Sequence, residues 1–457
     1  MVENTSVERI KEIRERQERF FRSGVTLDVK WRLERLKAFE AAVRKWEKPL
    51  CEALWTDLHK SYEEAYLTEV SILLGEIRSH IHNIRKWSRP QRKPTPLKMF
   101  PSRSKIISEP LGTALIISPW NYPVQLLLTP LVGAISSGCT AVLKPSPYVP
   151  NVSEVTRQMI EDTFSDEYVA VVQGNREVNT ALLEERWDLI FFTGSPALGR
   201  LVMGAAAKNL TPVILELGGK SPCIVDKDAD IKVAAKRIAW GKSLNAGQTC
   251  IAPDYLMIHE EIKDEFLKEL ETSFKELLGA DASTTGHFVR IVNDKAFDRL
   301  EGYLKDGRIT FGGHTDRDDR YFEPTVLDGV SPDAPVMREE IFGPIFPVQT
   351  FKDIDEVISF VTSREKPLAL YYFGSRGDYV LRHTSSGGAC INDTIMHIAN
   401  ENIPFGGVGN SGLGSYHFKR SFDAFTHYRA VVTTPTWLDL PFRYMPYKFF
   451  KVVKRLL

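Results

Sequence analysis

One cysteine stands out among the five that could supply a reactive thiol. Cys250 ends the run NAGQTC, whose small residues leave room for a substrate to approach. A thiolate in a polar, partly exposed setting can attack a carbonyl group. A cysteine is more often a small buried side chain, and the apolar strand-like contexts of Cys139 and Cys223 favour that role. The odd number, the wide spacing and the lack of a CxxC pair argue against a disulfide scaffold or a metal site.

Glu216 is a candidate general base, because it lies inside the apolar run ILELGG. Burial of a carboxylate is costly unless the group has a partner or a task. It would also raise the pKa and so make the group a usable base near neutral pH. The alternative is a glutamate on an edge strand that faces water.

Asn121 lies in the run PWNYP, where two prolines fix a turn after the strand-like run ALIIS. Its side-chain amide could donate a hydrogen bond to an oxyanion that develops during a reaction. The run could equally be a structural turn without a chemical role.

A phosphate could bind where Gly194 to Gly199 (GSPALG) follow a strand-like run and open a helix. Free N–H groups and the positive end of the helix dipole favour anions there. The pattern is neither GxGxxG nor a P-loop, so a plain strand-to-helix turn is an alternative. Lys144 ends the run TAVLK, where it could reach a ribose or a phosphate, although most such lysines are merely solvated.

The elements that must position these residues alternate in type. The first hundred residues are helical in character, and after about residue 101 short β-rich runs alternate with helical segments. Strands are expected at 113–118, 140–144 and 188–193, with helices near 124–137, 177–185 and 231–243. The run VILELGGKSPCIV is strand-like, whereas 404–414 resembles a close-packed functional loop. This order predicts an α/β fold with parallel sheets.

Length and composition set limits on the function. The chain has 457 residues, more than one compact core holds, so two or three domains are expected. A formal net charge of zero gives no reason to expect nucleic acid as a partner. Residues 111–143 carry no charge and are long enough to cross a bilayer, but three prolines favour a buried strand, helix and strand. The N-terminus has no secretory signal pattern, and a cytoplasmic location is expected.

The motifs in their order resemble the aldehyde dehydrogenase superfamily. The set is PWNYP, LKPS, FTGSPALG, LELGGKSP, NAGQTC, EEIFGP and PFGGVGNSG, and the similarity extends from about residue 5 to 435. The runs SPCIV, REKPLALY and GSYH resemble the class 3 branch, which includes fatty-aldehyde dehydrogenases. The resemblance implies oxidation of an aldehyde, of medium or long chain or aromatic, to an acid with NAD or NADP.

The resemblance also implies a domain organisation. An NAD(P)-binding α/β domain would comprise 1–85 and 104–216, and a catalytic α/β domain 217–424. A small β extension, 86–103 and 425–436, would join two subunits in a homodimer. Residues 437–457 would form a basic amphipathic tail.

By match to the family motifs, Cys250 is the nucleophile and Glu216 the base that activates water. Asn121 and the backbone N–H of Cys250 would form the oxyanion hole. Residues that would bind the cofactor are Ser118, Trp120, Lys144, Ser146, Gly194, Ser195, Gly199, Leu217, Glu340 and Phe342.

Three features depart from the class 3 pattern, and one of them is the run FVRIVN near Phe288, where the branch usually shows YGRI. Pro147 follows KPS where a glutamate usually binds the adenosine ribose, so the hypothesis is that NADP is accepted as well as NAD. Phe418 follows His417 where glycine is usual.

The tail PYKFFKVVKRLL would place Phe449, Val452, Val453 and Leu456 on one helical face and the basic residues around the other. Such a helix could cover a substrate mouth, pack on a partner subunit or lie on a membrane surface.

Three other functions remain as alternatives to the non-acylating enzyme. A CoA-acylating aldehyde dehydrogenase would normally lack the base at Glu216. A cysteine hydrolase would need a histidine base, and no histidine lies in a matching motif. A non-catalytic member of the fold would not be expected to keep Cys250, Glu216, Asn121 and Lys144 together.

Overall fold

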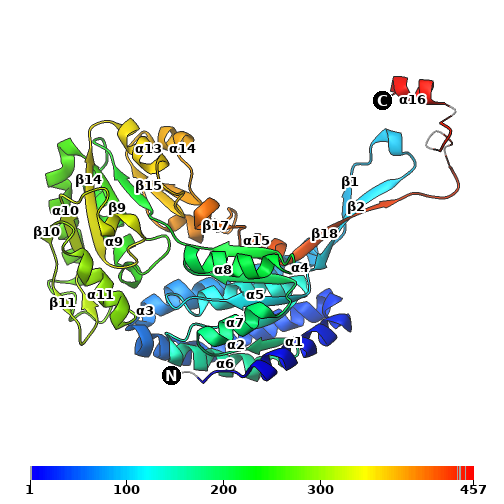
Figure 1. The fold of residues 1–457 in the computed structure, drawn as a ribbon, viewed down its shortest axis with the longest axis horizontal. Helices are drawn as coiled ribbons and strands as arrows, with labels where there is room; N and C mark the ends of the chain where they lie inside the picture. Colours follow the sequence, from blue (N-terminus) through cyan, green and yellow to red (C-terminus); the bar gives the residue numbers. More distant parts are fainter. Residues whose placement is uncertain (1–2, 440, 442–443, 448, 457) are drawn as a thin grey trace.

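The computed structural model describes residues 3–439, 441, 444–447 and 449–456. Two α/β bodies face each other, and a narrow arm projects from one of them and carries the C-terminal end of the chain (Figure 1). The expected α/β architecture with two largely parallel sheets is confirmed.

The first body is built on a six-stranded sheet in the order β17-β7-β6-β3-β4-β5. All neighbours are parallel except β17, which is antiparallel to β7. The strands are β3 (Thr113–Ile117), β4 (Thr140–Lys144), β5 (Val169–Val171), β6 (Leu189–Thr193), β7 (Val213–Glu216) and β17 (Gly412–Leu413). The helices of this body are α1 (Val7–Arg22), α2 (Val29–Leu58), α3 (Tyr62–Ala65), the π-helix η2 (Tyr66–Val70), α4 (Ser71–Trp87), α5 (Gln125–Ser137), α6 (Pro150–Thr163), α7 (Arg176–Glu184), α8 (Pro196–Ala207) and α15 (Lys419–Ala424).

Helices cover both faces of this sheet, which explains why its strands are apolar at successive positions. Leu115 and Ile117 of β3 pack with α1, α7 and α8, whereas Ala114 and Ile116 pack with α2, α4, α5 and α6. Successive side chains of a strand point to opposite faces, so a strand buried on both faces has no polar alternation.

The second body contains a seven-stranded sheet in the order β10-β13-β14-β9-β8-β15-β16, parallel except for β10. Its strands are β8 (Pro222–Val225), β9 (Tyr255–His259), β10 (Arg308–Phe311), β13 (Thr325–Asp328), β14 (Ile345–Phe351), β15 (Ala369–Phe373) and β16 (Gly388–Ile391). The helices are α9 (Ile231–Ser243), α10 (Lys263–Leu278), α11 (Asp294–Tyr303), α12 (Pro335–Arg338), α13 (Ile354–Thr362) and α14 (Gly377–His383), and a separate hairpin is formed by β11 (Thr315–Asp316) and β12 (Tyr321–Phe322).

The chain passes from one sheet to the other within the run VILELGGKSPCIV. The prediction of one strand-like run is wrong, because β7 ends at Glu216 in the first sheet and β8 begins at Pro222 in the second. A Cβ atom on Gly218 would lie 2.0 Å from a carboxylate oxygen of Glu340, so a larger residue at this crossing would require the Glu340 side chain to move. The loop expected at 404–414 contains the short strand β17 near its end.

The uncharged stretch 111–143 forms β3, α5 and β4, as the sequence predicted. Every residue of α5 is buried, and the backbone N–H groups of Val124 and Gln125 at its start donate to the Glu69 carboxylate. Among the described residues, no helix is long and apolar enough to cross a membrane.

The arm is an antiparallel sheet of β1 (Gln91–Lys93), β2 (Arg103–Pro110) and β18 (Thr426–Thr433). Beyond it lies α16 (Phe450–Leu456), so the tail contains the predicted helix. The predicted apolar face depends on the side chains at 452, 453 and 456, which lie outside the described residues, as does residue 448. The division of the chain into domains at residues 85, 103, 216, 424 and 436 remains a prediction from the sequence.

Candidate active site

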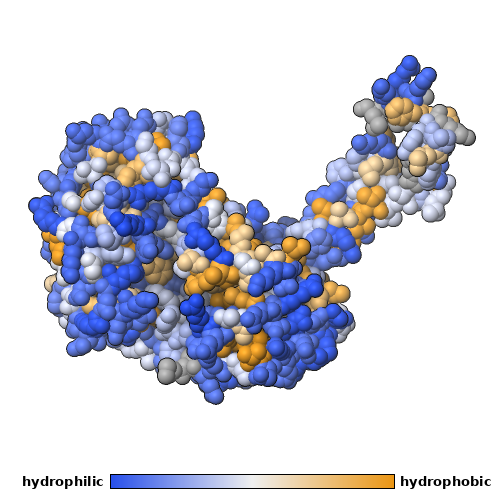
Figure 2. Space-filling model, viewed as in Figure 1, coloured by the Kyte–Doolittle hydropathy of each residue, from blue (hydrophilic) through white to orange (hydrophobic). Residues whose placement is uncertain are grey.

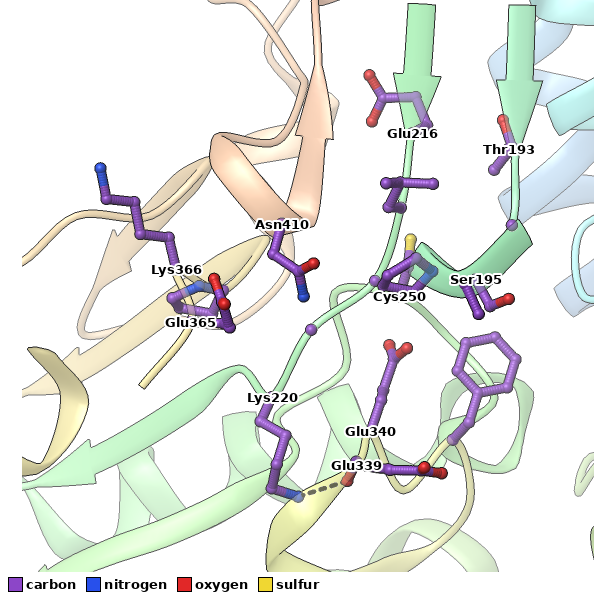
Figure 3. A pocket seen from close by; sticks show the side chains of 18 of the residues that line it. Thr193, Ser195, Glu216, Lys220, Cys250, Glu339, Glu340, Glu365, Lys366 and Asn410 are labelled. Atoms are coloured by element: carbon purple, nitrogen blue, oxygen red, sulfur yellow. Dashed lines mark hydrogen bonds between the residues drawn. The ribbon is translucent and has the colours of Figure 1, made fainter. Parts of the chain in front are cut away.

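A cavity of about 1060 Å³ lies where the two bodies meet. Its walls come from the ends of β6 and β7, the start of α8 and the loops around Cys250 and Glu340 (Figure 3). The cavity brings together most of the residues singled out from the sequence. These are Trp120, Asn121, Gly194, Ser195, Glu216, Leu217, Cys250, Glu340 and Phe342. Four others, Ser118, Lys144, Ser146 and Gly199, do not line it.

Cys250 follows a left-handed turn that fixes where its side chain lies. Asn245, Ala246 and Gly247 all have positive φ angles, of 51°, 51° and 71°. Residues other than glycine rarely adopt this conformation, so the surroundings must hold it. A Cβ atom on Gly247 would lie 2.4 Å from the backbone oxygen of Gly343, which ties the turn closely to the loop after Glu340.

Gln248 supplies much of the support for this turn. Its side-chain amide donates to the backbone oxygens of Asn245 and Arg290, at 3.1 Å each. Its side-chain oxygen accepts from the N–H of Val292 at 3.1 Å. The side chain is completely buried, so these bonds are shielded from water.

The Cys250 thiol is partly buried, and burial raises its pKa. The carboxylates of Glu340 and Glu216 raise the pKa further because negative charge nearby disfavours a thiolate. The backbone N–H groups of Cys250 and Ile251 act in the opposite direction. Formation of the thiolate is therefore less favourable at this site than at an exposed cysteine.

Glu216 ends β7 and is 3% exposed. The alternative of a glutamate that faces water is excluded. Neither carboxylate oxygen has a hydrogen-bond partner among the described residues, and burial raises its pKa well above the ordinary value. An unpaired buried carboxyl group that lines a cavity has the properties of a general base or acid.

Asn121 is tied directly to the loop that carries the cysteine. Its Nδ2 donates to the backbone oxygen of Gln248 at 3.0 Å, and its own backbone oxygen accepts from the Asn245 side chain at 3.0 Å. The hydroxyl groups of Tyr122 and Thr249 are 2.7 Å apart. The PWNYP turn and the NAGQTC run thus form one hydrogen-bonded unit.

The start of α8 forms the opposite wall. The Ser195 hydroxyl caps the helix by accepting from the Leu198 N–H at 3.4 Å, and Pro196 occupies the first helical position. Gly199 has a packing role, because a Cβ atom there would lie 2.7 Å from Leu217. The glycine lets the helix lie close to the strand end, so the helix N-terminus faces the cavity.

Several buried polar atoms have no hydrogen-bond partner among the described residues. Thr193 Oγ1 and Glu340 Oε1 belong to residues that line the cavity, and Ser118 Oγ belongs to a residue outside its lining. Buried polar atoms are normally paired, so these atoms fit a ligand rich in hydroxyl and amide groups, as a dinucleotide is.

Two further predicted cofactor residues lie beyond the cavity at the end of β4. Lys144 is buried, its ammonium group donates to the Pro145 backbone oxygen at 2.8 Å, and burial lowers its pKa to about 8. The Ser146 hydroxyl accepts from the Tyr148 N–H at 3.3 Å.

Phe342 adopts a φ angle of 51°, and its ring meets the edge of Trp120 with the two ring centres 5.4 Å apart. This contact joins the loop after Glu340 to the PWNYP turn.

The sequence reasoning missed several residues that hold the site. Lys220 donates to the backbone oxygen of Glu339 at 2.9 Å (Figure 3). It also donates to the backbone oxygen of Val336 at 2.8 Å and pairs with the Asp254 carboxylate. Its place in the motif LELGGK was the available signal. A buried pair, Lys60 and Glu69, contacts the Asn121 loop and lies in no motif that we recognised.

Comparisons with known proteins identify the family. The aldehyde dehydrogenase family model matches residues 1–431. This chain belongs to the aldehyde dehydrogenase family. It is 46% identical over 441 residues to the 4,4'-diaponeurosporen-aldehyde dehydrogenase of Staphylococcus aureus (strain NCTC 8325 / PS 47), covering 95% of this chain and 96% of that protein. It is 41% identical over 447 residues to the dimeric NADP-preferring aldehyde dehydrogenase of Canis lupus familiaris, covering 96% and 98%.

A solved structure of a related protein has the same fold as this aldehyde dehydrogenase. The substrate-bound state of Staphylococcus aureus AldH has a TM-score of 0.96 at 44% identity, covering 98% of this chain and 99% of that chain. The class 3 resemblance and the fold are therefore confirmed. The activity of the chain is the oxidation of an aldehyde to an acid with NAD(P).

Proposed function

We propose that this aldehyde dehydrogenase oxidises medium or long-chain aliphatic or aromatic aldehydes, with Cys250 as nucleophile and Glu216 as the base that activates water. The observation that most strongly supports this proposal is that Glu216, Cys250 and Asn121 line one cavity. Glu216 is buried without a hydrogen-bond partner among the described residues, and Asn121 supplies a buried amide donor. The N-terminus of α8 on the opposite wall supports the proposal that the cofactor binds there.

In the first step, the Cys250 thiolate forms an S–C bond to the aldehyde carbon, and the carbonyl oxygen becomes an oxyanion. Asn121 Nδ2 and the backbone N–H of Cys250 donate to that oxygen and stabilise it. When bound, the nicotinamide of the cofactor supplies the acceptor for the hydride that leaves the same carbon. Cys250 is left as a thioester.

Glu216 then takes a proton from water, and the resulting hydroxide attacks the thioester carbon. The carbon–sulfur bond breaks, the acid leaves and the thiolate is restored. The raised pKa of Glu216 gives the carboxylate more basicity than an exposed one has. Other residues are proposed to hold the cofactor, some in the cavity lining and some near the end of β4. They are Ser118, Lys144, Ser146, Glu340 and Phe342.

The alternatives fit this cavity less well. A CoA-acylating enzyme transfers the acyl group to a thiol and does not need a base for water, yet Glu216 lines the cavity. A cysteine hydrolase needs a histidine beside the thiol, and no histidine is among the described residues that line the cavity.

Replacement of Cys250 by serine should lower kcat for NAD(P)H formation by at least ~10³-fold, because a hydroxyl is a far weaker nucleophile than a thiolate. The matched control is Cys390→Ser, since Cys390 is partly buried, lies outside the cavity and is 3.4 Å from His397 Nδ1. The control should stay within about twofold of the wild-type rate, as neutral substitutions do. Comparable activity of the two variants would contradict the role of Cys250.

We propose that both NAD and NADP are accepted. Pro147 carries no charge that could repel a 2′-phosphate, and Lys144 lies nearby in the chain at the end of β4. The canine relative is named NADP-preferring. Steady-state kcat/KM should therefore differ by less than about a hundredfold between the cofactors, or ~2.7 kcal/mol. Pro147→Glu should shift the ratio towards NAD, and a wild-type preference for NAD above that limit would refute the proposal.

We further propose that two copies associate through the arm. Its exposed apolar residues form patches along the arm (Figure 2) and include Leu97, Phe100, Val432 and Trp437. The canine relative is named dimeric. Because α16 lies beyond the arm and away from the body of its own chain (Figure 1), the tail would reach the substrate mouth of the second copy. A cytoplasmic location stays a prediction.

Deletion of 437–457 tests the tail. Removal of a helix that covers a substrate mouth should change the dependence of kcat/KM on aldehyde chain length. The amount of protein that sediments with anionic vesicles should be the same with and without the tail. Loss of vesicle binding with an unchanged chain-length profile would favour a membrane contact instead.

A further inference from the structure

We propose that the segment 60–69 positions the reactive groups of the active site. Lys60 and Glu69 hold the loop that carries Asn121, and Glu64 holds the left-handed turn that precedes Cys250. This inference rests on the proposed function, because it assigns support to the oxyanion donor and the nucleophile named there. None of the three side chains lines the cavity, so all three are positioning residues.

The first support is a buried ion pair. Lys60 and Glu69 are both 0% exposed, and Lys60 Nζ lies 2.7 Å from Glu69 Oε1. The same ammonium group donates to the backbone oxygen of Asn121 at 3.1 Å. It also lies 4.2 Å from the centre of the Tyr122 ring, which adds a cation–π contact. Lys60 therefore fixes the loop at Asn121 itself.

Glu69 fixes the other end of the same loop. Its Oε2 accepts from the backbone N–H of Val124 at 2.8 Å and from that of Gln125 at 3.3 Å. These N–H groups begin α5, so the carboxylate also interacts favourably with the helix dipole. The backbone is thus held at Asn121 and again three residues later.

The second support runs from Glu64 to the nucleophile loop. Glu64 Oε1 accepts from the backbone N–H of Asn245 at 2.8 Å. Asn245 has a positive φ angle, and its side chain donates to the backbone oxygens of Asn121 and Gln248, at 3.0 Å each. Glu64 therefore stabilises a strained residue that links the two halves of the site.

The local helix geometry explains how two carboxylates of one segment reach both loops. Residues 66–70 form a π-helix directly after α3, and such wide turns are frequent at functional sites. A buried ion pair is weak evidence for stability, because the desolvation of two charges offsets their attraction. Here both charges bond to the backbone of the active-site loop, which gives the pair a role in positioning.

A double-mutant cycle tests whether Glu69 acts through Asn121. Glu69→Gln alone leaves Lys60 buried without its counter-ion, so kcat/KM for the aldehyde should fall roughly 10- to 100-fold through displacement of Asn121. In an Asn121→Ala background the same substitution should have less than about a threefold further effect, because the displaced donor is already absent. The dissociation constant of the cofactor should stay unchanged throughout.

The controls separate positioning from folding. Glu63→Gln is the matched substitution in the same segment, on α3, and the Glu63 side chain is 67% exposed, so wild-type kinetics are expected. Lys60→Met combined with Glu69→Gln removes both charges. It should recover the melting temperature relative to Glu69→Gln but keep the low kcat/KM, because methionine cannot donate to the Asn121 oxygen.

The possible failures can be distinguished. If Asn121→Ala alone leaves kcat/KM unchanged, the proposed oxyanion role fails and the inference fails with it. If Asn121→Ala is deleterious and the effect of Glu69→Gln is equally large in both backgrounds, only the inference is overturned. Full recovery of kcat/KM in the Lys60→Met, Glu69→Gln enzyme would also overturn it.

Discussion

The structure is organised around a buried ionisable carboxyl group, Glu216, at the point where the chain leaves one sheet for the other. It has no hydrogen-bond partner within the part of the chain that the structure describes. Such a group is unfavourable in the folded state unless the surrounding structure is stable enough to offset it. The strand β7 ends at this residue, and the next strand, β8, belongs to the second sheet. The same crossing therefore places the carboxyl group between the two bodies and leaves a cavity beside it.

The rest of the site also contains an unfavourable feature that neighbouring contacts stabilise. The left-handed turn at Asn245 and Ala246 is strained, and Gln248, Glu64 and the close contact of Gly247 with the neighbouring loop hold it. The apolar contacts on the buried faces of the two sheets stabilise the fold and offset this local strain. The site is pre-organised because buried polar bonds fix the backbone on either side of each reactive group.

Periodicity and turn chemistry predicted much of this arrangement. The uncharged β3, α5 and β4 region and the helix that opens within the run GSPALG followed from residue types, and Cys250, Glu216 and Asn121 line one cavity. The split of VILELGGKSPCIV between two sheets could not be predicted, because each half is an acceptable strand and the choice depends on tertiary pairing. Lys60 and Glu69 were missed for a related reason, since the backbone atoms that they bind lie 61 and 55 residues away along the chain.

The central claim is that Cys250 carries the acyl group and Glu216 controls its release. The most direct test is the intact mass and peptide map of Glu216→Gln enzyme quenched after mixing with an aldehyde and cofactor. If Glu216 is the base for deacylation, the peptide that contains Cys250 should carry an acyl adduct, and one equivalent of reduced cofactor should form per active site. Reduced cofactor without an adduct, or an adduct on a different cysteine, would contradict the central claim.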